Sequence, residues 1–562
     1  MNQVRTFLLI AWLLVGFLLW EAWQQQQAAP AVADSTATSS VELESGLPSA
    51  DGGPDPSLPS ASAEAAPPSA TDAGQPTSFV GGQQVSIDTD VLKLVVDTRG
   101  VSVIGAELKD YGVAPAKDSD RVVLFSDQTK RFFIAQQGWV AQDTAAPNHQ
   151  EYFDSAQTEY RLADGQDELR VPFVWQGENG LTLTRELVLR RGQYAIEVVD
   201  TLLNRGSSTW TGNAYRQFTR VPPEIKSGFT HPESYSFTGV AWYSDADKFN
   251  KITFDDIEGK REEKAGANRA WVAMLQHYFF AAWIPAPTDN VTVTVDRLGS
   301  NGRYLIRAFS PKQQIAAGEQ LQQSVKLYVG PKLQEQLSQV APGLELAIDY
   351  GILTVLSEPL FWLLSWFHAL LGNWGWSIIL LVVVIKAAFF KLSETQYKSF
   401  AKMRAIQPRI ESLKERYGDD RQKFNMAMME LYKKEKINPM GGCLPILLQI
   451  PVFIALYWVL LESVELRHAP WMLWIQNLSA PDPYFVLPVL NLLTMWLTQK
   501  LSPTPGMDPM QKKMMQAMPL VFGVMFAFFP AGLVLYWTVN GALGLLQQWV
   551  ITRRHGVSSA KA

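Results

Sequence analysis

The sequence predicts a multi-domain membrane protein, in which an amino-terminal anchor helix and an extracytoplasmic antiparallel β-sandwich precede an α-helical transmembrane core. Three observations predict it. An apolar run follows Arg5 at the start of the chain, residues 79–330 alternate in polarity with period two, and five apolar stretches follow residue 374. With 47% hydrophobic residues and 19 Trp in 562 residues, the chain is more apolar than a soluble protein of this length.

Composition excludes several classes of site. Cys443 is the only cysteine, so an intrachain disulfide, a CxxC motif and a cysteine-based zinc site are all impossible. The six histidines form no HExxH pair, and no P-loop, GxGxxG or GxSxG motif occurs. We therefore expect no enzyme activity, no cofactor and no metal. The net charge of -5 says little, because acidic and basic residues occupy different segments.

Residues 1–23 read as a transmembrane signal-anchor, since the apolar run from Thr6 to Trp23 is nearly long enough to span a bilayer. The alternative is a cleavable signal, for which Ala31-Val32-Ala33 offers a site beyond the apolar end. Residues 24–78 are rich in Ala, Pro and Ser and cannot bury enough apolar surface to fold. We expect a disordered linker there.

Residues 79–330 predict a β-sandwich domain on the far side of the membrane. Short alternating runs such as Leu92–Asp97 and Val291–Val295 are separated by turn signals. One interpretation of a sandwich of this size is a carbohydrate-binding domain, with Trp271, Tyr278 and Trp283 lining a cleft. Aromatic residues at this spacing more often belong to a core, and no paired carboxylates accompany them.

Residues 331–373 read as helical. Leu353–Leu371 mixes Leu, Trp and Phe with Pro359 and His368, so we expect an amphipathic helix in the outer membrane interface rather than a crossing.

Residues 374–552 predict five crossings, at about 374–390, 444–461, 484–497, 514–529 and 533–551, followed by a short cytoplasmic tail at 553–562. Residues 391–438 predict a cytoplasmic helical hairpin, because apolar residues recur every three or four positions on both sides of Gly418-Asp419-Asp420. Residues 391–436 carry twelve Lys or Arg against seven Asp or Glu, which agrees with the positive-inside rule. The third and fourth crossings are short enough, about 21 to 24 Å, to thin the bilayer.

Lys386 is a charged residue inside the first of these crossings, which is costly and marks a functional candidate. Its long stem could also simply reach the headgroups. Gln449, Thr494 and Asn540 fall in the inner half of their crossings, and no Asp or Glu lies inside any crossing. A cation without an anion implies water or a visiting partner. We therefore predict a hydrated recess that opens to the cytoplasm and ends inside the membrane.

The core resembles the YidC/Oxa/Alb membrane-insertase family in its Gram-negative form. The resemblance covers about residues 345–552 and rests on Gln396-Tyr397, Ala401-Lys402-Met403-Arg404, Gln407-Pro408, Asn438-Pro439-Met440-Gly441-Gly442-Cys443-Leu444-Pro445, Gln449-Ile450-Pro451-Val452-Phe453, Gly532-Leu533-Val534-Leu535-Tyr536-Trp537 and Gln547-Gln548. The amino-terminal half also resembles this architecture, whose outer domain is a mutarotase-type β-supersandwich.

The resemblance implies an insertase and chaperone that inserts integral membrane proteins, alone or with the Sec translocon, through a hydrophilic groove open to cytoplasm and lipid. Lys386 stands where many members have Arg, which favours transient attraction over a fixed bidentate salt bridge. Groove positions implied are Gln449, Thr494 and Asn540, and the residues implied to contact substrate helices are Ile450, Phe453, Tyr536 and Trp537.

The implied partners are nascent membrane-protein substrates, the Sec translocon with its accessory subunits, membrane lipid and, weakly because the tail is short, the ribosome. No direct nucleic-acid binding is implied. The implied location is the bacterial inner membrane, with the large domain in the periplasm and both termini in the cytoplasm. Two other classes remain open from the residues: a transporter or channel, and a membrane-tethered carbohydrate enzyme.

Overall fold

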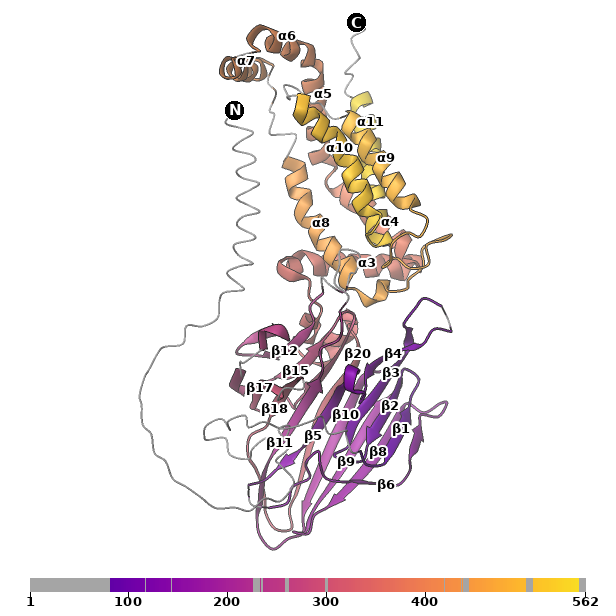
Figure 1. The fold of residues 1–562 in the computed structure, drawn as a ribbon, viewed down its shortest axis with the longest axis vertical. Helices are drawn as coiled ribbons and strands as arrows, with labels where there is room; N and C mark the ends of the chain where they lie inside the picture. Colours follow the sequence, from indigo (N-terminus) through magenta and orange to yellow (C-terminus); the bar gives the residue numbers. More distant parts are fainter. Residues whose placement is uncertain are drawn as a thin grey trace, which may run out of the picture.

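The computed structural model describes residues 81–554 except 117, 143, 226–232, 234–235, 258–261, 299–301, 419, 436, 438–443 and 502–508. The predicted anchor at 1–23, the linker at 24–78, the motif at Asn438–Cys443 and the tail beyond residue 554 therefore lie outside the described residues. In the described part, a β-sandwich occupies one end and a group of helices the other (Figure 1).

The sandwich consists of two large sheets. One contains eleven strands, in the order β14-β17-β18-β11-β5-β3-β2-β1-β7 with β4 paired to β3 and β19 to β11; the other has the order β13-β12-β15-β16-β20-β10-β9-β8-β6. The strands are β1 Gln84–Asp88, β2 Leu92–Asp97, β3 Ser102–Gly112, β4 Arg121–Phe125, β5 Phe133–Val140, β6 Asp154–Ser155, β7 Glu159–Arg161, β8 Glu168–Gln176, β9 Leu181–Arg190, β10 Ala195–Asn204, β11 Trp210–Arg220, β12 Gly239–Ser244, β13 Lys248–Thr253, β14 Glu262–Ala267, β15 Trp271–Leu275, β16 Phe279–Ile284, β17 Val291–Leu298, β18 Arg303–Phe309, β19 Gln313–Ile315 and β20 Gln320–Pro331.

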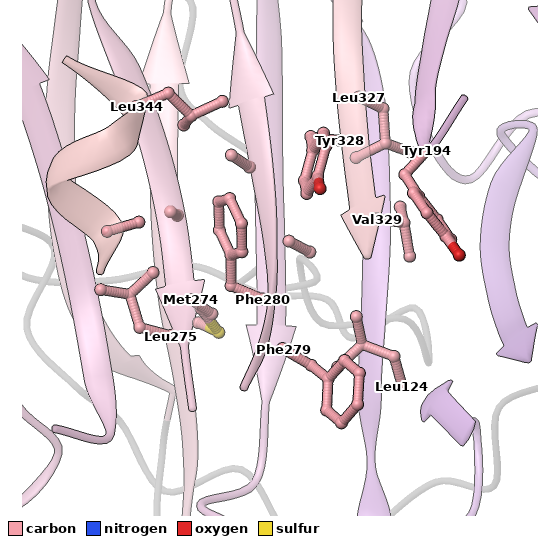
Figure 2. Packing of buried hydrophobic residues seen from close by; sticks show 14 of the residues in the cluster. Leu124, Tyr194, Met274, Leu275, Phe279, Phe280, Leu327, Tyr328, Val329 and Leu344 are labelled. Carbon is pink, nitrogen blue, oxygen red and sulfur yellow. The ribbon is translucent and has the colours of Figure 1, made fainter. Parts of the chain in front are cut away.

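Period-two alternation places one face of each long strand in the core. Along β10 the residues alternate strictly between buried and partly exposed, and β10 pairs antiparallel with β9 in the register Val198 with Leu187. Trp271 and Trp283 are 0% and 1% exposed, so they belong to the core, as the favoured interpretation of the sequence predicted. Phe280 and Tyr328, on neighbouring strands β16 and β20, stack in the same core (Figure 2).

The helical part follows β20. Its helices are α2 Gln334–Val340, α3 Thr354–Leu371, α4 Trp374–Ala388, α5 Phe390–Ala405, α6 Gln407–Tyr417, α7 Arg421–Lys434, α8 Leu444–Glu462, α9 Val486–Leu501, α10 Pro509–Phe526 and α11 Ala531–Arg554. Helix α3 lies between the sandwich and the remaining helices (Figure 1), packing on α4 and α8, and the Ser357 hydroxyl donates to the carbonyl of Ala455 at 3.2 Å.

The antiparallel hairpin comprises a shorter stretch of chain than the predicted 391–438. Helices α4 and α5 meet at an angle of 68°, and α5 packs against α11, so Phe390–Ala405 lies beside the helical group. The chain then breaks at Ile406, before Pro408 in the first turn of α6, leaving α6 and α7 as the antiparallel pair. Asp420 caps α7, accepting from the amides of Gln422 and Lys423 at 3.1 and 3.0 Å.

The apolar helices differ in length from the predicted crossings. Helices α9 and α10 have 16 and 18 residues, because α9 continues to Leu501 and α10 starts at Pro509. By length and hydropathy, Gly351–Leu371 is the one helix in the described chain that is able to cross a membrane. The bent pair α4–α5 is a second candidate if the two helices are counted as one span. Gln449–Glu462 and Lys513–Phe526 are shorter apolar stretches. The number of crossings remains a prediction.

Candidate functional site

Lys386 lies in the last turn of α4, where the side chain of Asn373 caps the helix start and the chain bends after Phe389. It is only 9% exposed. Its Nζ lies beside Gly544 of α11, since a Cβ built on that glycine would be 3.7 Å away. The Tyr397 hydroxyl of α5 donates to the carbonyl of Gly544 at 3.0 Å, and the Gln547 amide donates to the carbonyl of Lys386 at 3.2 Å. Three helices therefore fix the surroundings of this charge.

The side chain of Lys386 borders a small cavity, which we call the Lys386 recess. Gln449 of α8 and Asn540 of α11 line it as well, so three of the four predicted polar groove residues come together. The other lining residues are Ile385, Phe389, Val452 and Tyr536. The volume is about 10 Å³, enough for about one water molecule. The recess is therefore much narrower in this conformation than the hydrated pocket expected from the sequence.

The charge in the recess has no counter-ion in the described chain: no carboxylate lies within 4.0 Å of Lys386 Nζ. Burying an ammonium without a partner is unfavourable, so a site of this kind attracts an anionic or strongly polar visitor. The described lining offers an ammonium and two amide groups, which can hydrogen-bond a carboxylate or carbonyl group.

Thr494 lies outside the recess. Its hydroxyl donates to the carbonyl of Asn491 at 2.8 Å, and the same oxygen would be 2.7 Å from a Cβ on Gly541. Thr494 therefore packs in the contact between α9 and α11, where the missing side chain of Gly541 gives it room. Its role as a groove residue stays a prediction.

The four predicted substrate-contact residues lie on the two helices that flank the recess. Phe453 of α8 stacks on Tyr536 with ring centroids 6.1 Å apart and contacts Trp537 at 4.6 Å, both on α11. Ile450 is 43% exposed. These aromatic rings form the contact between α8 and α11, so a client helix that occupied this position would have to separate them.

Sequence reasoning missed three polar features near the site. Asn491 of α9 is 1% exposed, and neither its Oδ1 nor its Nδ2 has a hydrogen-bond partner. An amide inside an apolar run, one turn before Thr494, was the available signal. Tyr397 and Gln547 support the Lys386 backbone and Gly544, and both belong to motifs that carried the family resemblance without being assigned a role.

The sandwich contains a separate cleft, distinct from the Lys386 recess. Tyr278 lines a cavity of about 910 Å³ on the side of the sandwich that faces the helices, together with Arg467 of the loop after α8. Trp271 and Trp283 are buried elsewhere in the core. Within the described residues no group of His, Cys, Asp or Glu has the arrangement of a metal site.

An apolar helical group with a lone cation in a polar recess, joined to a large β-sandwich, defines an integral membrane protein with a water-exposed domain. A family model described as the YidC periplasmic domain matches residues 84–363, and one described as the 60Kd inner membrane protein matches residues 366–558. The chain belongs to the YidC family of the inner membrane.

Relatives named "Membrane protein insertase YidC" are similar over the full length. The protein of Stenotrophomonas maltophilia (strain R551-3) is 47% identical over 99% of this chain and 97% of its own. That of Xanthomonas campestris pv. campestris (strain ATCC 33913) is 46% identical over 100% and 99%. A solved structure of an active YidC insertase aligns with 84% of this chain and 95% of its own at 17% identity, with a TM-score of 0.37.

Proposed function

We propose that this protein inserts integral membrane proteins into the inner membrane and helps them fold, with the Lys386 recess as the place where a client's polar flank enters. The observation that carries the proposal is the buried Lys386 ammonium, which shares its cavity with Gln449 and Asn540 and has no carboxylate beside it in the described chain. An acidic or amide-rich flank is the ligand that this group attracts best.

Entry of a client requires α8 and α11 to separate at the stack of Phe453 on Tyr536 and Trp537. The polar flank then contacts Lys386 while the apolar segment of the client slides along these rings, with Ile450 at the exposed side. Burial of the apolar segment in lipid supplies the free energy, at about 25 cal/mol per Å². The protein needs no nucleotide, cofactor or metal and is not an enzyme in this scheme.

The topology we propose has five core crossings, α3 in the outer interface, the sandwich in the periplasm and both termini in the cytoplasm. Support comes from charge: the α5–α7 region is rich in Lys and Arg, and α11 ends in Arg553 and Arg554. Exposed Trp362, Trp366 and Leu370 on α3 suit a helix that lies at the lipid surface. Nascent clients and lipid are direct partners, while the Sec translocon and, weakly, the ribosome are further ones.

The test compares client pairs that differ only in the charge of the translocated flank, using purified protein in liposomes without a translocon. Lys386→Ala should lower insertion of the acidic-flank client about tenfold, a factor worth about 1.4 kcal/mol, and change the neutral client much less. Lys386→Arg should retain activity. Lys500→Ala is the matched control, because Lys500 is an exposed cation on α9 that stacks on Trp496 outside the recess.

Equal insertion of acidic and neutral clients by both Lys386 variants would contradict the electrostatic part of the proposal. Solute flux through the same liposomes without any insertion would favour a transporter or channel instead.

A further inference from the structure

Helix α8 forms one wall of the Lys386 recess, yet within the described chain it packs mainly on α3 and only slightly on α11. In Figure 1 it stands apart from the group of α4, α9, α10 and α11. Pro451 lies within the helix, beside Gln449 and Val452 of the recess. A proline in a helix interior removes one backbone hydrogen bond and permits bending there. The position of this wall therefore depends on what holds the outer end of α8.

The sandwich holds that outer end through buried polar groups. Glu462, the last residue of α8, lies 3.8 Å from Lys332 Nζ at the end of β20, and both side chains are 1% exposed. The hydroxyl of Ser236 donates to Glu462 Oε1 at 2.5 Å. His277 Nε2 lies 3.1 Å from the carbonyl of Leu461. Three sandwich residues thus contact two successive residues of one helix.

The loop after α8 adds a second connection to the same region. The Arg467 guanidinium lies over the rings of Tyr278 and Phe279 and donates to the carbonyl of Val113 at 3.3 Å. Tyr278 has a positive φ of 65°, an uncommon conformation for an aromatic residue, and stacks on His277. The backbone is held in an unfavourable conformation where the sandwich meets the helices, which the surrounding contacts must enforce.

A buried ion pair of this kind is a poor device for stability alone. Desolvation of both charges opposes their attraction, and neither Lys332 Nζ nor Glu462 Oε2 has a hydrogen-bond partner. Two apolar side chains would hold the domains together at less cost. A charge pair specifies one relative arrangement more strictly, because a shift that separates the partners leaves each charge buried alone.

We propose that Lys332 and Glu462 are positioning residues for insertion: together with Ser236 and His277 they fix the outer end of α8, so that only its inner part moves when the recess opens. Gln449 is thirteen residues from Glu462, or about 20 Å along the helix. With the outer end fixed and a proline two residues beyond Gln449, the inner turns can move away from α11 and part Phe453 from Tyr536 and Trp537. Without the outer contacts, α8 pivots as a whole and the recess loses its defined width.

The experiment measures the α8–α11 distance directly in full-length protein in liposomes. Spin labels replace Ile450 and Leu546, which are exposed on α8 and α11, in a Cys443→Ser background that removes the only native cysteine. Lys332→Met and His277→Phe alter the sandwich side, and Glu462→Gln alters the helix side while keeping an acceptor for Ser236. Each variant should broaden and shift the distance distribution well below the melting temperature, and insertion of neutral and acidic clients should fall together severalfold.

Lys109→Met is the matched control, since Lys109 pairs with Asp88 at 2.7 Å inside the sandwich, away from α8. It should leave both readouts unchanged. An α8–α11 distance distribution like that of the wild type in the Lys332 and His277 variants would overturn the proposal, whether or not insertion falls. A broadened distribution with full insertion activity would overturn it as well. If Glu462→Gln does not fold, the two sandwich-side variants decide. The activity readout rests on the proposed insertion function, but the distance readout does not. A loss of insertion that is selective for acidic clients would instead point to the Lys386 site.

Discussion

At the scale of residues, two buried lysines have opposite surroundings. Lys386 lies in a small polar recess with no carboxylate near its ammonium in the described chain, whereas Lys332 faces Glu462 across the junction of sandwich and helices. The first arrangement leaves a charge available to a client. The second uses its charge internally, to hold one helix. We propose that the same residue type serves client binding in one place and helix positioning in the other.

His277 provides a pH-dependent contact at that junction. Burial lowers the pKa of His277 to about 4, and the positive charges of Lys332 and Arg467 act in the same direction, while the hydrogen bond with the Leu461 carbonyl and the charge of Glu233 oppose them. The neutral ring donates from Nε2 to Leu461, and Nδ1 has no partner. Because the folded-state pKa lies below the unfolded value of about 6.5, this contribution to stability is complete above pH 6.5 and is lost as the pH falls towards 4.

We therefore expect the free energy of unfolding to fall by about 2 kcal/mol between pH 7.5 and 5 through this residue alone. His277→Gln keeps a donor for Leu461 but does not titrate, so its thermal melting curve should shift less over the same pH range. Melting in detergent at both pH values measures the difference. An equal shift in wild type and variant would contradict the assignment.

The recess was more predictable than the junction for a physical reason. Lys386, Gln449 and Asn540 are polar residues inside apolar runs, and such residues stand out because lipid penalises them. Lys332 and Glu462 lie at the ends of their elements, 130 positions apart, so nothing local marks them as a pair. Asn491 is also an amide inside an apolar run, but its sequence position alone does not show that it is buried.

At the scale of elements, the contact between α9 and α11 depends on a glycine. A Cβ on Gly541 would approach Thr494 Oγ1 to 2.7 Å, so Gly541→Ala must displace Thr494 or the helix that carries it. We expect a loss of about 1–3 kcal/mol, seen as a lower melting temperature. Gly544→Ala is the control three residues later on α11, because its Cβ would meet its neighbours at 3.5 and 3.7 Å, an ordinary contact. Equal melting temperatures for the two variants would contradict this packing.

The hairpin offers a second test at this scale. Asp420→Ala removes the side chain that accepts from two amides at the start of α7. Hydrogen exchange of the first turn of α7 should become severalfold faster, while Asp420→Asn, which can still cap, should exchange as the wild type does. Unchanged exchange in the alanine variant would show that the cap contributes nothing.

Element types were more predictable than element ends. The alternating run Leu92–Asp97 is strand β2 with those bounds, because period two is a local property. Strand β9 continues through the charged Arg185, since that side chain is buried in an ion pair with Asp200. The bend at Phe389 accompanies packing of α5 against α11, which an apolar stripe does not reveal, whereas the break at Ile406 precedes Pro408.

At the scale of the whole molecule, the sandwich and the helices are coupled at one end of α8, while the recess lies wholly in helices. Deleting residues 79–329 removes Ser236 and His277 but leaves Lys386, Gln449 and Asn540 in place. We expect insertion in liposomes to fall severalfold without vanishing. Complete loss would make the sandwich indispensable to the reaction, and full activity would argue that α8 needs no outer support.

The central claim is that the Lys386 position can be reached by water and polar peptide from the cytoplasmic side. The direct measurement is labelling of Lys386→Cys, in the Cys443→Ser background, with a membrane-impermeant thiol reagent added to the cytoplasmic face of inverted vesicles. We predict labelling that a bound client slows, with Leu381→Cys, which is fully buried in the same helix, as the unlabelled control. A position 386 that stays unlabelled, or that labels equally with and without client, would contradict the account.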